Sequence, residues 1–336
     1  MKKENPSKEK LKMIYRDILN GYTAVKVKNR GTAHIKHLTS SDSVELDEVF
    51  EESKNKAVKM GINTKEQQVE YLKEEKLWTA KEDDELSEAL VYLDSLRQTK
   101  SKLYLKSQID QIKEEMEETE AKASRLESSK REMLGVTAES YAEKRVNEYY
   151  MLHVMYKDKE FKEILIPEEE FEEMDDIRLG EVIKYYNDAT KLFNSHSFKL
   201  VALSAFMANS FALCDNNPFT FYGRPVVNLT FFQIEIFSHA AYFKHVLQDS
   251  KVKPPSNLMN DPEELIEWFE ASKNAEEMVD KMKGEGAGGS SLVGATKDDL
   301  ERLGLSKKQT GQKSLSAEAA KRGGSLTMDD FAEIHS

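Results

Sequence analysis

The segment DQIKEEMEETEAKASRLESSKRE, residues 110–132, indicates the main architectural element of this chain. Its composition is almost wholly polar, yet its few apolar side chains fall on one stripe with alternating steps of three and four residues. That is heptad spacing, which predicts a long helix with one narrow packing seam. The stripe extends just beyond the segment and consists of Ile109, Ile112, Met116, Thr119, Ala123, Leu126, Lys130 and Met133.

A second apolar stripe precedes the first, within residues 80–100. The two stripes are similar in length and joined closely, near residues 105–107, so we expect them to pair as an antiparallel helical hairpin. Thr119, Ala123 and Lys130 weaken the seam, so pairing between two chains in a longer coiled coil, and with it a homo-oligomer, stays open. The second stripe consists of Leu86, Leu90, Leu93 and Leu96.

Helix starts elsewhere carry capping boxes, in which a capping oxygen precedes an acid or amide by three residues. The segments 64–67, 79–82 and 261–264 have this pattern, and Pro262 sits at a first helical position. Weaker versions occur at 107–110 and 296–299. These signals predict a mainly α protein, a helical bundle with the long hairpin.

The N-terminal region is the exception to this helical pattern. After a helix ending near Asn20, two β-prone runs, 24–28 and 32–37, flank the turn 29–31. We expect a small β-hairpin packed on neighbouring helices, because an isolated hairpin is marginal in water.

The chain divides into five expected segments, with the main core in the most hydrophobic one, from Ile177 to Leu247. Its uncharged run 200–214 is too short to span a bilayer and is expected to be a buried helix. The segments are 1–62, an N-terminal helix and β-hairpin region; 63–160, a helical region with the coiled-coil hairpin; 161–250, the hydrophobic helical core; 251–283, a helix; and 284–336, a flexible Gly/Ser linker with a short amphipathic tail.

Composition narrows the classes of function. The 336 residues carry 49 basic against 61 acidic side chains, a net charge of −12, which disfavours binding to nucleic acid or an anionic membrane. The start of the chain lacks the apolar region of a secretory signal. Cys214 is the only cysteine, so no intrachain disulfide forms, and we expect a soluble protein of the reducing cytoplasm.

Motifs that carry chemistry are missing from the sequence. His34 and His37 fall on opposite faces of a predicted strand, and His239 and His245 lie six apart on a predicted helix, so neither pair suits a metal. Nucleophile and phosphate-loop signatures are also missing. We therefore expect no catalytic residues, no metal and no cofactor.

The segment CDNNPFTFYGRPVVNLTFFQIE, residues 214–235, is the candidate contact region of the body. Its helix stop, 215–218, is followed by Phe219, Phe221, Tyr222 and Arg224. The favoured interpretation is a core-closing turn, and the alternative is an aromatic pocket or docking surface anchored by Arg224. In the tail, the amphipathic pieces with Leu300, Leu303 and Phe331 are further candidate partner contacts.

Three segments together carry a family resemblance: LYLKSQIDQI (103–112), LGVTAESYAEKRVNEYY (134–150) and DNNPFTFYGRPVVNLTFFQIEIFSHAAYFKHVL (215–247). Their ordered run resembles proteins encoded among the tail genes of large tailed bacteriophages, described as tail assembly chaperones or virion-associated tail proteins. The similarity covers roughly residues 12–248. It implies a non-enzymatic role, holding a tape-measure or tail-tube protein during assembly, in the host cytoplasm or in the virion.

Two hypotheses follow. The first is a phage assembly or structural protein that binds other tail proteins through the hairpin and the C-terminal tail. The second is a small-ligand-binding protein or enzyme that uses the aromatic turn at 215–230. The first predicts that this turn is packed solid, and the second that it lines a pocket with a perturbed ionisable group.

Overall fold

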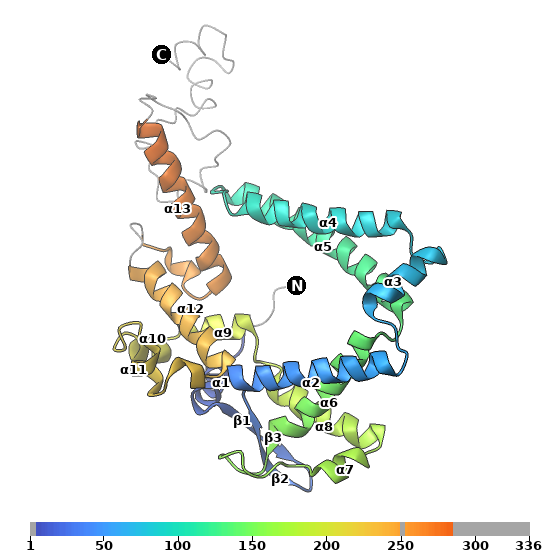
Figure 1. The fold of residues 1–336 in the computed structure, drawn as a ribbon. Coiled ribbons are helices and arrows are strands. Elements are labelled where there is room, and N and C mark those ends of the chain that lie inside the picture. The colour runs from blue at the N-terminus through green and yellow to red at the C-terminus, as the bar shows by residue number, and fades with distance from the viewer. Residues whose placement is uncertain (1–4, 249–252, 285–336) are drawn as a thin grey trace.

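The computed structural model describes residues 5–248 and 253–284 (Figure 1). These residues form a mainly helical protein with a small three-stranded antiparallel sheet near the N-terminus. The predicted fold class is confirmed, including the long helical hairpin and the N-terminal β-hairpin. The prediction of a flexible tail falls on residues 285–336, which lie outside the described residues.

The sheet is built on helix α1 (Lys8–Asn20), which ends at Gly21 in a left-handed conformation, φ 78°. Strands β1 (Tyr22–Val27) and β2 (Gly31–Lys36) follow and pair antiparallel, one to two residues earlier in sequence than predicted. Asn29 makes the turn with φ 62°. The third strand, β3 (Met155–Tyr156), pairs with β2 and was not predicted.

A helix that the sequence analysis did not identify leads away from the sheet. Helix α2 (Ser40–Lys59) begins at a capping box in which Asp42 accepts a hydrogen bond from the backbone N of Thr39, at 2.8 Å. It packs along α6 (Ala138–Val154), which Thr137 caps by accepting a hydrogen bond from the backbone N of Ser140. Helix α3 (Lys65–Glu74) then connects this pair to the hairpin.

Helices α4 (Ala80–Lys100) and α5 (Lys106–Leu134) form the predicted antiparallel hairpin within one chain, which we call the arm. Figure 1 shows the arm extending from α3 toward α13 (Pro262–Gly284). Its seam differs from the prediction at two places: Ala89 is buried where Leu90 was predicted, and Leu134, which packs against Leu72 and Trp78, is buried where Met133 was predicted.

The start of α5 also differs from the prediction. The helix begins at Lys106 after Leu105, without a side-chain cap, so Ser107 lies inside the helix rather than at its N-cap. Leu105 is buried, and packing at this position sets the boundary in place of a capping oxygen.

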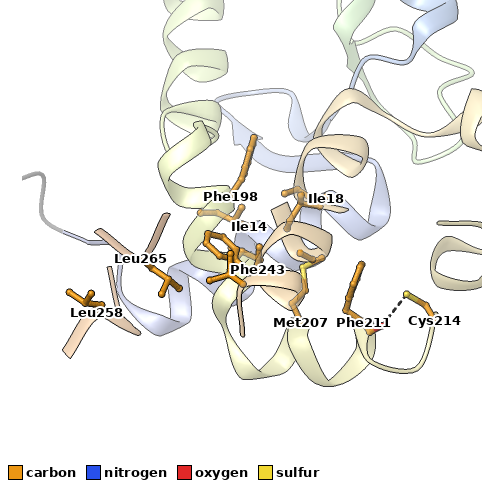
Figure 2. Close-up of a cluster of buried hydrophobic side chains, with 14 of the residues drawn as sticks. Ile14, Ile18, Phe198, Met207, Phe211, Cys214, Phe243, Leu258 and Leu265 are labelled. Atoms are coloured by element: carbon orange, nitrogen blue, oxygen red, sulfur yellow. Dashed lines mark hydrogen bonds between the residues drawn. The ribbon is translucent and has the colours of Figure 1, made fainter. Parts of the chain in front are cut away.

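The main core lies in the segment predicted for it, supplemented by α1 and α13 (Figure 2). The run 200–214 is not one helix: Ser204 adopts an extended conformation, ψ 143°, and separates two helices. The remaining helices are α7 (Glu168–Glu172), α8 (Asp176–Thr190), α9 (Ser195–Leu203), α10 (Ala205–Phe211), α11 (Pro218–Tyr222) and α12 (Phe231–Gln248), with 3₁₀ turns η1 (Val226–Asn228) and η2 (Ser256–Leu258). In the described part of the chain, no helix has the length and apolar character needed to cross a membrane.

Candidate interaction site

The aromatic turn is a short helix followed by a 3₁₀ turn. α10 ends at Phe211, before the predicted stop at 215–218, and Asp215 and Asn216 then turn the chain in left-handed conformations, φ 48° and 55°. The side chain of Asn217 then accepts hydrogen bonds from the backbone N atoms of Phe219 and Thr220, at 2.9 and 3.4 Å, and so caps α11. Local side-chain chemistry therefore fixes the path of the turn.

Part of the turn faces inward and is structural. The ring of Phe221 packs against Phe211 and Phe237 with centroid distances of 6.0 and 5.9 Å. The hydroxyl of Tyr222 donates to the carbonyl of Gln233 at 2.9 Å, and burial raises the pKa of this phenol. The inward positions of these two side chains agree with the interpretation of the segment as a core-closing turn.

Gln233 is a structural residue that the sequence analysis missed. Its amide nitrogen, on α12, donates to the carbonyls of Ile18 at 2.8 Å and Leu19 at 3.3 Å, both in the last turn of α1. Its backbone N donates to Thr230 Oγ1, and its Oε1 accepts from the backbone N of Thr230. The spacing of Thr230 and Gln233 is a capping box and could have identified the pair.

The other part of the turn faces outward. Leu213 is 84% exposed, Val227 72% and Phe219 57%, and Val226 and Phe231 are also exposed. We call these five residues the turn patch. Arg224, the polar anchor of the alternative interpretation, is exposed and forms no ion pair within the described residues. The turn is thus not packed solid, because its apolar side chains divide between the core and the surface.

A shallow hollow of about 280 Å³ adjoins the turn patch, between α1 and the α10–α11 connection. The thiol of Cys214 is buried there and donates to the carbonyl of Phe211 at 3.0 Å. None of the lining residues carries a carboxylate, an imidazole or an amine, so the hollow holds no base to activate the thiol. They are Tyr15, Leu19, Ser210, Leu213, Cys214, Thr220 and Phe221.

The histidines near the sheet are core residues in different surroundings. His34 is buried with its ring against Tyr22, whereas the Nε2 of His37 lies 2.9 Å from Thr23 Oγ1. The ring of His37 packs between Phe193 and Phe232. Among the described residues, no three His, Cys, Asp or Glu side chains gather as metal ligands would.

Comparison with protein families gives one match: residues 258–317 match the SAM domain (sterile alpha motif), a protein–protein interaction and homo-oligomerisation module. The described part of the match comprises the end of η2 and helix α13. Leu300 and Leu303 fall inside the match and Phe331 outside it, and all three lie outside the described residues. Comparison with curated proteins and with solved structures gives no match.

Proposed function

We propose that this chain is a non-enzymatic protein-binding scaffold, whose helical body presents two contact regions to other proteins. The observation that carries the proposal is the SAM match over residues 258–317, a segment of the kind used for protein partners and for self-association. Helix α13, the start of this segment, is built into the body through Leu265 and Trp268, both fully buried. A partner bound to the segment would therefore be held close to the body.

The assembly hypothesis predicted a solidly packed turn, which is wrong for the turn patch, but the exposed apolar side chains favour the same class of function, protein binding. Exposed apolar side chains that gather in one region often mark a protein–protein contact, and these five all fall within residues 213–231. Here Phe219 and Val227 point outward while neighbouring aromatic residues fill the core, so the exposure is not needed to form the turn. The hollow beside the patch offers no catalytic pair, which favours binding over catalysis at this position.

The resemblance to tailed-bacteriophage tail proteins supplies the partner class. On this proposal, the chain binds a tape-measure or tail-tube protein during virion assembly, as a tail assembly chaperone or as a virion-associated tail protein. Its overall net charge of −12 is compatible with a protein that stays dispersed while it binds an aggregation-prone partner.

Affinity capture from phage-infected cells tests the proposal. The full chain is compared with Leu300→Asp/Leu303→Asp, which alters the SAM segment, and with Phe219→Ser/Val227→Ser, which alters the turn patch. Val44→Ser removes an equally exposed apolar side chain on α2 and serves as the control. We expect tail proteins with the full chain and the control, and a loss with one or both double variants. Equal capture by all four proteins would contradict the proposed contact regions, and capture of no phage protein would contradict the partner class.

A further inference from the structure

The tip of the arm lies against α13, the first helix of the SAM-matching segment (Figure 1). Ile109 of α5 is buried against Ala271 and Ala275, which are one turn apart on α13. Leu103 and Tyr104, in the connection between α4 and α5, cover the edge of this small cluster. Alanine at both α13 positions lets the arm approach closely, but it buries little apolar area.

Charge forms a second part of this contact. Glu267 of α13 is only 7% exposed, and its carboxylate accepts hydrogen bonds from Lys106, at 2.8 Å, and pairs with Lys113, both on α5. Burial alone would raise the pKa of Glu267, but the hydrogen bonds from the two lysines outweigh it and hold the pKa below its usual value. The carboxylate is therefore charged and paired while the arm is in place.

Asn274 forms the third part. Its side-chain amide donates to the backbone carbonyls of Ser101 and Leu103, both at 2.9 Å. Ser101 ends α4, where carbonyl groups have no partner inside the helix. α13 thus satisfies the end of α4, yet water can replace this bond if the arm moves away.

The opposite side of α13 is held in a different way. Leu265 and Trp268 are buried in the main core, which stabilises that side by burial of large apolar side chains. On the arm side, the contacts are small or polar. When a buried ion pair separates, the two charged groups regain solvation free energy that nearly offsets the electrostatic attraction they lose. The arm contact is therefore the weaker of the two, and its rupture leaves α13 attached to the body.

We propose that the arm is a releasable cover on α13, so that a protein that binds the arm-facing side of the SAM segment must first displace the arm tip. The existence of a protein partner in this inference rests on the proposed function, whereas the contact between the arm and α13 does not depend on it.

Release of the arm requires the chain to bend where the arm joins the body. Both connections contain a residue with positive φ, Lys76 at 58° and Gly135 at 61°, outside the regular helices. In the covered state the side with Glu267, Ala271 and Asn274 is closed to partners.

Distance measurement between two spin labels tests release directly. In a Cys214→Ser background, labels are attached at Val91→Cys on α4 and Val44→Cys on α2, both exposed positions. The parent should give one dominant distance. Lys106→Glu/Lys113→Glu replaces the two positive charges that pair with Glu267 and Asp110 by negative charges, and we expect a second, displaced population. The control, Glu263→Gln, is also on α13 but breaks a pair with Lys199 of α9, away from the arm, and should leave the distance unchanged.

An unchanged distribution in a folded Lys106→Glu/Lys113→Glu variant would overturn the proposal. If that variant does not fold, hydrogen exchange of the unmodified chain decides: amides of α5 near Ile109 should exchange faster than those near Leu126, and equal protection would overturn it. Capture from infected cells is measured separately, and release should increase it. Since the distance result does not depend on capture, failure of the cover and failure of the proposed function remain distinguishable.

Discussion

Lys130, at a heptad position of α5, donates a hydrogen bond to Asp83 of α4 at 2.7 Å across the base of the arm. The same carboxylate accepts from Trp78 Nε1 at 2.7 Å and pairs with Lys73. The hydrogen bond from Lys130 is the largest of several effects that lower the pKa of Asp83 well below its usual range. A lysine that weakens the seam by sequence therefore joins the two helices of the arm through Asp83, which Lys73 in turn links to α3, and Lys106 and Lys113 hold the arm tip to Glu267.

The first prediction concerns this base. Asp83→Ala should lower the free energy of unfolding of the arm base by about 2 kcal/mol, because two ammonium groups and an indole N–H lose their acceptor together. Trp78 and Trp268 are the only tryptophans, so a Trp268→Phe background makes Trp78 the reporter in a denaturant titration followed by fluorescence. Glu85→Ala, which removes only the long, exposed pair with Lys81, is the control. The same midpoint for both variants would contradict the role of Asp83.

The second prediction is a dependence of stability on pH. Burial lowers the pKa of His37 to about 4 in the folded chain, against about 6.5 when unfolded. The unfolded chain therefore binds the proton first, so the stability contributed by neutral His37 is present above pH 6.5 and is lost as the pH falls toward 4. The loss is on the order of 3 kcal/mol.

Thermal unfolding between pH 7 and 4.5 measures the effect of His37. His37→Phe removes the titration and should flatten the slope in this range, whereas His153→Asn, at a half-buried helix position, should keep it. A slope that persists in His37→Phe would assign the pH dependence to other groups.

Local signals in the sequence predicted much of the fold. The capping boxes at Thr64 and Thr79, the turn at Asp215 and Asn216, and the arm were all predictable, because each depends on residues close in sequence or on a regular period. The burial of Ala89 instead of Leu90 in the seam could not be predicted, because packing against the partner helix determines which side chain is buried.

The candidate site shows the same division. The chemistry of the turn predicted its path, but not which aromatic residues would be buried: Phe219 and Phe221 are two positions apart, and one faces solvent while the other faces the core. The contact of Glu267 with Lys106 and Lys113 joins residues more than 150 positions apart, and no local pattern indicates it. Strand β3 escaped prediction because two residues at a helix end carry no period.

The third prediction concerns the buried amide that joins α12 to α1. Gln233→Leu should lower the free energy of unfolding of the body by about 2–3 kcal/mol, because it removes the side-chain donor to the carbonyls of Ile18 and Leu19 and half of the capping box at Thr230. Fluorescence of Trp268, in a Trp78→Phe background, reports this region in a denaturant titration. Gln248→Leu, at the far end of α12, is the control, and equal loss in both variants would contradict a specific role for Gln233.

The fourth prediction separates the two sides of the aromatic turn. Phe221→Ala should destabilise the body by about 3 kcal/mol, because it leaves a cavity between Phe211 and Phe237. Phe219→Ala should change the unfolding free energy by less than about 0.5 kcal/mol, since its ring is mostly in solvent. The two truncations remove the same atoms two residues apart, so each controls for the other in a denaturant titration. If Phe219→Ala also lowers capture of the partner while the fold keeps its stability, the exposed ring is a binding residue; a stability loss equal to that of Phe221→Ala would instead place it in the core and remove it from the turn patch.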